Sequence, residues 1–194
     1  MAIKKTITFI DWLQTGLIRT CRVHFVFIAA YAVYIIAADA TKLIEPELVL
    51  QRWTMNAVML TGVITVWYLA RSSVKKSSYY RILFSVVILL DIAMATFNVY
   101  SQRGMASRAV ILFCIPIVVS ALLLSRTALF LTASLCTAAY SLAAVKYFVD
   151  YFNEGYKAEL YIEVSFYVTT FFVLAGLLSV LVRFKNSESR LEVR

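Results

Sequence analysis

Few residues of this chain could do chemistry inside a membrane, and the most unusual of them is Asp91. It lies in the middle of RILFSVVILLDIAMATFNVY, residues 81–100, where nearly every other side chain is apolar. A carboxylate near the middle of a bilayer costs about 2.5–3.5 kcal/mol on insertion scales, so we expect Asp91 to face the interior of a helix bundle. Asn98 lies seven residues later, on the same helical face. Asp91 and Asn98 are therefore the candidate ligand-binding residues.

Two roles for Asp91 are open. In the first, the carboxylate belongs to a site for a ligand or a proton, because ionisable residues inside membranes mark such sites. In the second, it makes an interhelical hydrogen bond that fixes how neighbouring helices align. The sequence predicts a polar group in the bundle interior and leaves both roles standing.

The remaining reactive residue types predict no catalysis, metal site or cofactor. The single histidine, His24, is interpreted as an interfacial polar residue near the inner end of the first span. One imidazole cannot build a bis-histidine haem site. The three cysteines, Cys21, Cys114 and Cys136, have no CxxC spacing and are expected to be buried thiols. No phosphate loop, nucleophile elbow or HExxH motif is present.

The elements that must position these residues are transmembrane helices. The chain of 194 residues is 62% hydrophobic and 15% charged, whereas soluble domains are about 45–50% apolar and about 25% charged. Six runs have no charge or only Asp91, and at about 17–25 residues a run of this kind spans a bilayer. They lie at residues 23–38, 53–70, 82–102, 109–125, 127–145 and 164–182. The runs do not alternate, which excludes a β-barrel and predicts an all-α bundle of six transmembrane helices.

The predicted organisation has three parts. Residues 1–20 form a short interfacial amphipathic helix, because ITFIDWLQTGLIRTCR places Phe9, Trp12 or Leu13, Gly16 and Leu17 along one helical stripe. A frayed polar start is the alternative. Residues 21–184 form the six-helix transmembrane domain. Residues 185–194 begin a cytoplasmic signalling helix.

The distribution of basic residues predicts the orientation. With the amino terminus in the cytoplasm, thirteen of the 19 basic residues fall in inner segments and six, Arg52 among them, fall in outer segments. Both termini are therefore expected on the cytoplasmic side of the inner (plasma) membrane. The net charge of +8 is interpreted as attraction to anionic inner-leaflet lipids, and no nucleic-acid partner is expected.

Three further patterns concern the last three spans and their connections. Ser125-Arg126 predicts a tight hairpin between the fourth and fifth spans, and Pro116 is expected to kink the fourth. Small residues recur every four positions in the fifth span and predict close helix packing: Ala133, Thr137 and Ser141, and Ser134 and Ala138. The outer segment KYFVDYFNEGYKAELYIE is rich in aromatic residues, which predicts an interfacial belt, a lid over an outward-facing pocket, or both.

The stretch from the third to the fifth span resembles the six-span amino-terminal region of many bacterial sensor histidine kinases. In that family the third span carries an Asp, a Thr and a Tyr. A glycine-containing turn, a proline-bearing span, a tight turn and a small-residue helix follow. The matching positions are Asp91, Thr96, Tyr100, Gly104, Pro116, Leu122 to Leu124, Ser125-Arg126 and the alanines of the fifth span. The resemblance covers roughly residues 80–194, and the usual double glycine before the fourth span is replaced by QRGMAS.

This resemblance implies a membrane-embedded sensory input domain of a two-component system. The terminal RFKNSESRLEVR is similar to the start of the signalling helix of such kinases, and no phosphoacceptor histidine or ATP-binding motif follows it. We therefore expect an input domain without a catalytic module, not an enzyme, that forms a homodimer in the lipid bilayer. Its stimulus would be a small ligand or a property of the bilayer. The alternative is a small six-span transporter or channel, although the broken-helix pair and internal repeat of transporters are not found.

Overall fold

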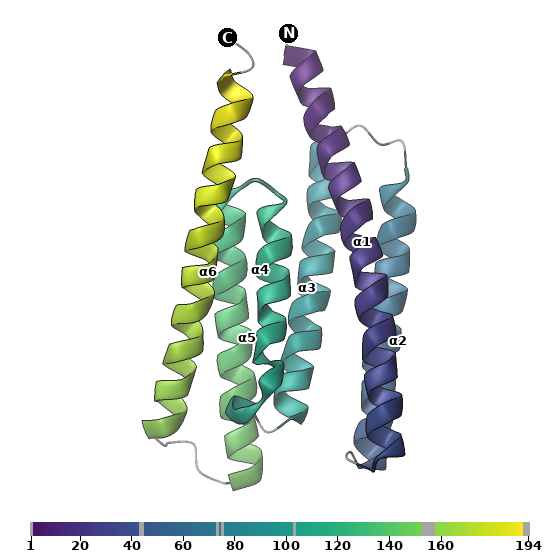
Figure 1. Cartoon of the computed structure of the whole chain (residues 1–194), viewed down its shortest axis with the longest axis vertical. Helices are drawn as coiled ribbons and strands as arrows, with labels where there is room; N and C mark the ends of the chain where they lie inside the picture. The colour runs from purple at the N-terminus through teal and green to yellow at the C-terminus, as the bar shows by residue number, and fades with distance from the viewer. Residues whose placement is uncertain are drawn as a thin grey trace. The chain divides into compact units, whose positions relative to one another are not determined.

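The computed structural model describes residues 2–42, 45–72, 74, 76–102, 104–152 and 158–191, and within these ranges every regular element is a helix (Figure 1). The all-α prediction is confirmed. In chain order the elements are α1 (Ala2–Ala40), α2 (Pro46–Ala70), α3 (Ser77–Ser101), the 3₁₀ helices η1 (Gly104–Ala106) and η2 (Arg108–Phe113), α4 (Cys114–Ala121), α5 (Arg126–Phe152) and α6 (Ala158–Leu191).

Five helices in the described ranges are long and apolar enough to cross a membrane, and the fourth span is a shorter composite. That span covers Arg108–Ala121, six residues of η2 followed by eight of α4. At about 2.0 Å rise per 3₁₀ residue and 1.5 Å per α-helical residue, it is roughly 24 Å long. Pro116 lies in the first turn of α4, so the change of helix type comes just before the proline.

The first span differs in extent from its prediction. The candidate span covers Phe9–Ala40 within the single helix α1, with no helix end near residue 20. That residues 1–20 lie on the membrane surface stays a prediction.

The chain divides into two compact units, residues 1–90 and residues 91–194, so that α3 contributes its first half to one unit and its second half to the other. In the first unit, the buried face of α1 is a stripe with spacings of three and four residues. It runs through Leu13, Leu17, Cys21, His24, Ile28, Tyr31, Ile35 and Ala38. Residues at this spacing line one side of a helix and form the seam along which it packs on another helix. In this unit α1 packs on α2.

The connection from α2 to α3 is held by side-chain hydrogen bonds within the first unit. The Gln14 side chain of α1 donates from Nε2 to the Ala70 carbonyl at 2.9 Å, where α2 ends. The Tyr80 hydroxyl donates to the Ser72 carbonyl at 3.1 Å. The first bond satisfies a carbonyl group that the end of α2 leaves without a helical partner, and the second ties the connection to the start of α3.

In the second unit, a cluster of aromatic rings joins η2, α5 and α6. The ring centroids of Phe113, Tyr140 and Phe171 lie 5.6–6.1 Å apart, and Tyr167 lies 5.4 Å from Tyr140. Phe113, Tyr140 and Phe171 are fully buried. Large aromatic side chains at these distances pack favourably through their edges and faces, and here they form the centre of the unit.

The predicted hairpin between the fourth and fifth spans is present. Four residues connect α4 to α5, and Leu124 among them has φ +51°, a conformation in which a helix commonly ends. The Ser125 side chain, which directly precedes α5, then accepts a hydrogen bond from the Ala128 amide, as an N-cap residue does. Of the small residues in α5, Ala133 is buried, whereas Ser134 and Ala138 are exposed, so the second repeat does not pack within this unit.

Gly104 shapes the corner between α3 and η2. It has φ +59°, which a side chain disfavours, and a Cβ at this position would lie 2.7 Å from Cδ1 of Tyr147. The glycine therefore allows η1 to lie against α5.

We predict that Gly104→Ala destabilises the protein by about 1–3 kcal/mol, because the new methyl group meets Tyr147 and the positive φ becomes strained. Thermal unfolding in detergent measures the effect. Gly176→Ala is the matched control, because a Cβ there has nothing within 4 Å, and it should be neutral or stabilising by up to ~1 kcal/mol. Equal unfolding temperatures for the two variants would contradict the role given to Gly104.

Candidate functional site

Asp91 and Asn98, the two residues predicted as a site, lie on one buried face of α3. Asp91 is 5% exposed and Asn98 is fully buried. Seven residues of α-helix separate them by about 10 Å along the axis. Between them on this face lie Met94 and Ala95, both buried, so two polar positions flank an apolar one.

Asn98 is held by side-chain hydrogen bonds within its own helix. Its Nδ2 donates to the Met94 carbonyl at 2.9 Å, and its Oδ1 accepts from Nε2 of Gln102 at 3.2 Å. Gln102 is half-buried at the end of α3. A polar run therefore extends from the end of this helix inward to Asn98.

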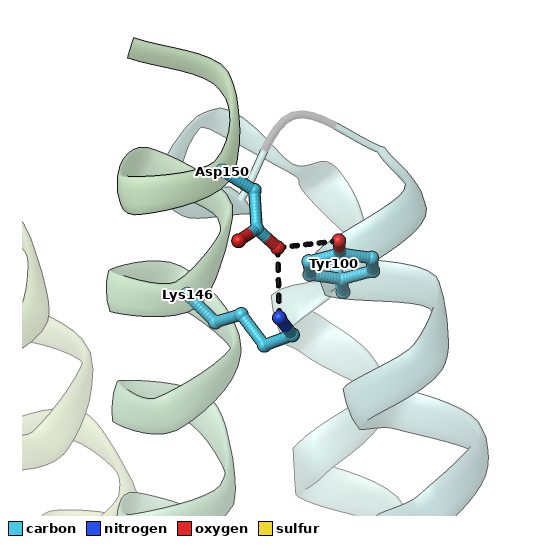
Figure 2. A network of polar contacts seen from close by, with 3 residues as sticks. All are labelled: Tyr100, Lys146 and Asp150. Carbon is cyan, nitrogen blue, oxygen red and sulfur yellow. Dashed lines mark hydrogen bonds and ion pairs between the residues drawn. The ribbon is translucent and has the colours of Figure 1, made fainter. Parts of the chain in front are cut away.

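Beside this run, α3 and α5 are joined by three side chains that we call the Tyr100 network: Tyr100, Lys146 and Asp150 (Figure 2). The Tyr100 hydroxyl donates to Oδ2 of Asp150 at 2.7 Å, and Nζ of Lys146 lies 2.9 Å from the same oxygen. The Lys146 ammonium also lies 5.8 Å from the centre of the Tyr100 ring. One carboxylate oxygen thus receives a hydroxyl and a cation from two helices.

The network is open to its surroundings. The side chain of Lys146 is 66% exposed and that of Asp150 is 34% exposed. An exposed ion pair contributes little to the free energy of folding. Its role here is to hold the side chains of the Tyr100 network in position relative to one another. A ligand that bears its own hydroxyl, amine or carboxylate can compete for any of the three partners. We therefore regard the Tyr100 network, together with the Asn98 run, as the candidate functional site.

The aromatic segment that was predicted as a belt or a lid begins within α5. Tyr147 stacks on Tyr151 with ring centroids 4.6 Å apart, and Phe148 lies 5.4 Å from Phe152. Tyr147 also packs edge-on against Tyr100 at 6.3 Å, which places the cluster beside the Tyr100 network. Residues 153–157, which include Glu154, Tyr156 and Lys157, lie outside the described residues.

His24 is 3% exposed and belongs to the buried stripe of α1. That it lies near a membrane interface stays a prediction. Its Nδ1 lies 2.8 Å from the Thr20 carbonyl. Because a carbonyl only accepts, Nδ1 carries the hydrogen, which leaves Nε2 as the nitrogen able to accept.

The cysteines are free thiols, and within the described ranges no three His, Cys, Asp or Glu side chains gather as metal ligands. A groove of about 610 Å³ runs along α2 from Thr54 to Leu69 and along α3 from Leu83 to Leu90. Its threonine hydroxyls, such as that of Thr61, donate to their own helix, so the groove offers little polar chemistry. It includes neither Asp91 nor Asn98.

The Tyr100 network was not predicted as a site. Lys146 and Asp150 are four residues apart, a spacing at which opposite charges meet on a helix, and this signal is visible in the sequence. Their contact with Tyr100, fifty residues away along the chain, is not.

Comparison with known proteins gives one match. A family model described as a PilS-like transmembrane domain, with six transmembrane segments, matches residues 10–191. Searches of curated proteins and of solved structures find no match.

We predict different outcomes for two substitutions of Asp91. Asp91→Asn keeps the size and much of the hydrogen bonding, so thermal stability in detergent should stay close to that of the wild type. Asp91→Leu removes the buried carboxylate together with the interactions it makes, and should destabilise the protein by about 1–3 kcal/mol. If Asp91→Asn folds normally and abolishes a ligand or pH response, Asp91 is a functional site. Wild-type stability and response in both variants would show that it is neither site nor anchor.

Proposed function

The chain belongs to the family of PilS-like transmembrane domains, and from this membership we propose that it is the input region of a membrane signalling protein of the sensor histidine kinase type. PilS is itself a sensor histidine kinase. In this proposal the six helices detect a stimulus in or at the membrane and pass it to a catalytic module carried after the last helix.

The observation that carries the proposal is the continuity of α6. Its candidate span is Ala158–Arg183, and the same helix continues to Leu191. At about 1.5 Å per residue the helix is roughly 51 Å long, against about 30 Å for the hydrocarbon core. A helix without interruption can transmit a rotation or a shift along its axis from one side of the membrane to the other.

The Tyr100 network supplies a starting point for such a movement. It joins α3 to α5, and α5 packs on α6 through Tyr140, Tyr167 and Phe171. A stimulus that separates Tyr100 from Asp150 would free the end of α5 that leads into α6. We infer a small outward-presented ligand or a change in the bilayer as the stimulus.

A homodimer through α6 would complete the signalling device. Only 11% of the most apolar stretch of α6 is buried in the structure, against 56% of the corresponding stretch of α3. Val173, Leu177 and Val180 are exposed at spacings of four and three residues, and this stripe continues in sequence to Phe184 and Leu191. Spacings of this kind suit a seam between two parallel copies of the helix. The side chains beyond Arg183 lie outside those described, so the seam is described only up to Val180.

We predict that single cysteines at positions 185–192 form crosslinks with a helical period in native membranes, and that the 173–177–180 stripe continues that period. A membrane-permeant reagent should crosslink them in intact cells and an impermeant reagent should not, because we place both termini in the cytoplasm. Crosslinks absent at every position would favour a monomeric carrier. Crosslinking by the impermeant reagent would overturn the proposed orientation.

A kinase fusion tests the signalling role. With a dimeric histidine kinase module fused after Arg194, Tyr100→Phe should change autophosphorylation in membrane vesicles by roughly fivefold or more, the usual scale of coupling between sites. Tyr151→Phe is the matched control, since it removes a hydroxyl from the same aromatic cluster and leaves the Asp150 contact in place. The fusions of the wild type, Tyr100→Phe and Tyr151→Phe should be compared at several lengths of the linker between Arg194 and the kinase module. Identical kinase activity of the three at every linker length would count against an input role for the Tyr100 network.

A further inference from the structure

Arg52 is a charged residue buried inside α2. The sequence predicts it in an outer segment, and in the structure it is the seventh residue of the helix that begins at Pro46. It is 3% exposed, and Asn56, one turn further along, is 5% exposed. Both lie on the buried face of α2. An arginine this deeply buried needs a partner, because an unpaired charge away from water is costly.

The partners of Arg52 are few and neutral. Its Nη1 donates to the hydroxyl of Tyr34 at 3.1 Å, and its Cζ lies 5.6 Å from the Tyr34 ring centre. Over the part of the chain that the structure describes, no carboxylate forms an ion pair with it. Its Nε is buried without an acceptor, and Oδ1 of Asn56 is buried without a donor. Two adjacent turns of α2 therefore present buried polar atoms without hydrogen-bonding partners.

The depth of Arg52 indicates which anion could supply the missing acceptor. Residues 53–70 carry no charge, and at about 1.5 Å per residue these eighteen residues span roughly 27 Å, close to the thickness of the hydrocarbon core. Arg52 precedes this stretch directly, so a hydrocarbon core that residues 53–70 cross would place Arg52 at the core boundary. Trp53 beside it is 40% exposed, as expected for an aromatic belt residue. Phosphate groups are the anions found at this depth of a phospholipid bilayer.

We propose that Arg52, Tyr34 and Asn56 form a phosphate-binding site between α1 and α2. The planar guanidinium offers paired N–H groups that match two phosphate oxygens. In the structure the Tyr34 hydroxyl holds the position of one such oxygen, as a neutral acceptor on Nη1. Tyr34 is 45% exposed, so its ring can turn outward and give way to the anion. A half-turn of the Asn56 amide presents Nδ2 as a further donor.

Two sources can supply the phosphate. One is the headgroup of a phospholipid whose chains lie along the helices, and the other is inorganic phosphate from solution. Both use the same contacts with Arg52, so the test separates them by the probe. The site is independent of the signalling role proposed above.

The test measures thermal stability of the full chain in an uncharged detergent, with inorganic phosphate or with phosphatidylglycerol added at constant ionic strength. The wild type should be stabilised by one of the two probes. Arg52→Gln should weaken the apparent affinity for that probe by roughly tenfold or more, because it removes a charged donor. Arg108→Gln, which removes an exposed arginine charge, is the matched control and should respond like the wild type.

Tyr34→Phe keeps the test decisive even if Arg52→Gln does not fold. It removes the hydroxyl that holds the place of the anion, so the affinity for the effective probe should rise. An arginine with only a structural role would instead lose a hydrogen bond and gain no affinity. Stabilisation by the lipid alone identifies a headgroup as the source, and stabilisation by inorganic phosphate identifies the soluble anion. The proposal is overturned if neither probe stabilises the wild type, or if both act equally on the wild type, Tyr34→Phe and Arg52→Gln.

Discussion

The constraint on which this structure depends is that hydrocarbon offers no hydrogen bonds. Every backbone polar group of a span must find its partner inside the span, which makes each long apolar segment a helix. Several threonine hydroxyls follow the same rule here. Those of Thr61, Thr65 and Thr132 all donate to the carbonyl four residues earlier in their own helix. Such side chains add little to the contacts between helices, so packing must come from shape.

The two units pack their helices closely in different ways. In the first, the stripe of α1 uses mostly aliphatic and small residues, with His24 and Tyr31 among them, at spacings of three and four, and α2 packs on α1. In the second, the rings of Phe113, Tyr140 and Phe171 fill the space between η2, α5 and α6. The hydroxyl of Tyr140 is buried without a partner among the described residues, an energetic cost that the packing of its ring must offset.

Properties that depend on composition could be read from the sequence, and properties that depend on contacts between distant segments could not. Apolar runs and their length predicted the helices, and the Asp91-to-Tyr100 pattern predicted the family. The sequence did not indicate that Arg52 would be buried, because its burial depends on how α2 packs, and the helix itself begins earlier, at Pro46. The burial of His24 likewise depends on the packing of α1 on its neighbours, which its position in the sequence does not specify. The Tyr100 network needs two helices to be aligned, and no local pattern specifies that alignment.

The composite fourth span has a consequence for the bilayer around it. Its roughly 24 Å falls several ångströms short of a hydrocarbon core of about 30 Å. Ile111 and Val118 on this segment are exposed, so lipid can contact it. A short lipid-facing segment makes the surrounding membrane thin, at a cost of fractions of a kcal/mol per ångström. The cost grows with acyl-chain length, so membrane thickness acts as a mechanical load on the junction where η2 passes directly into α4.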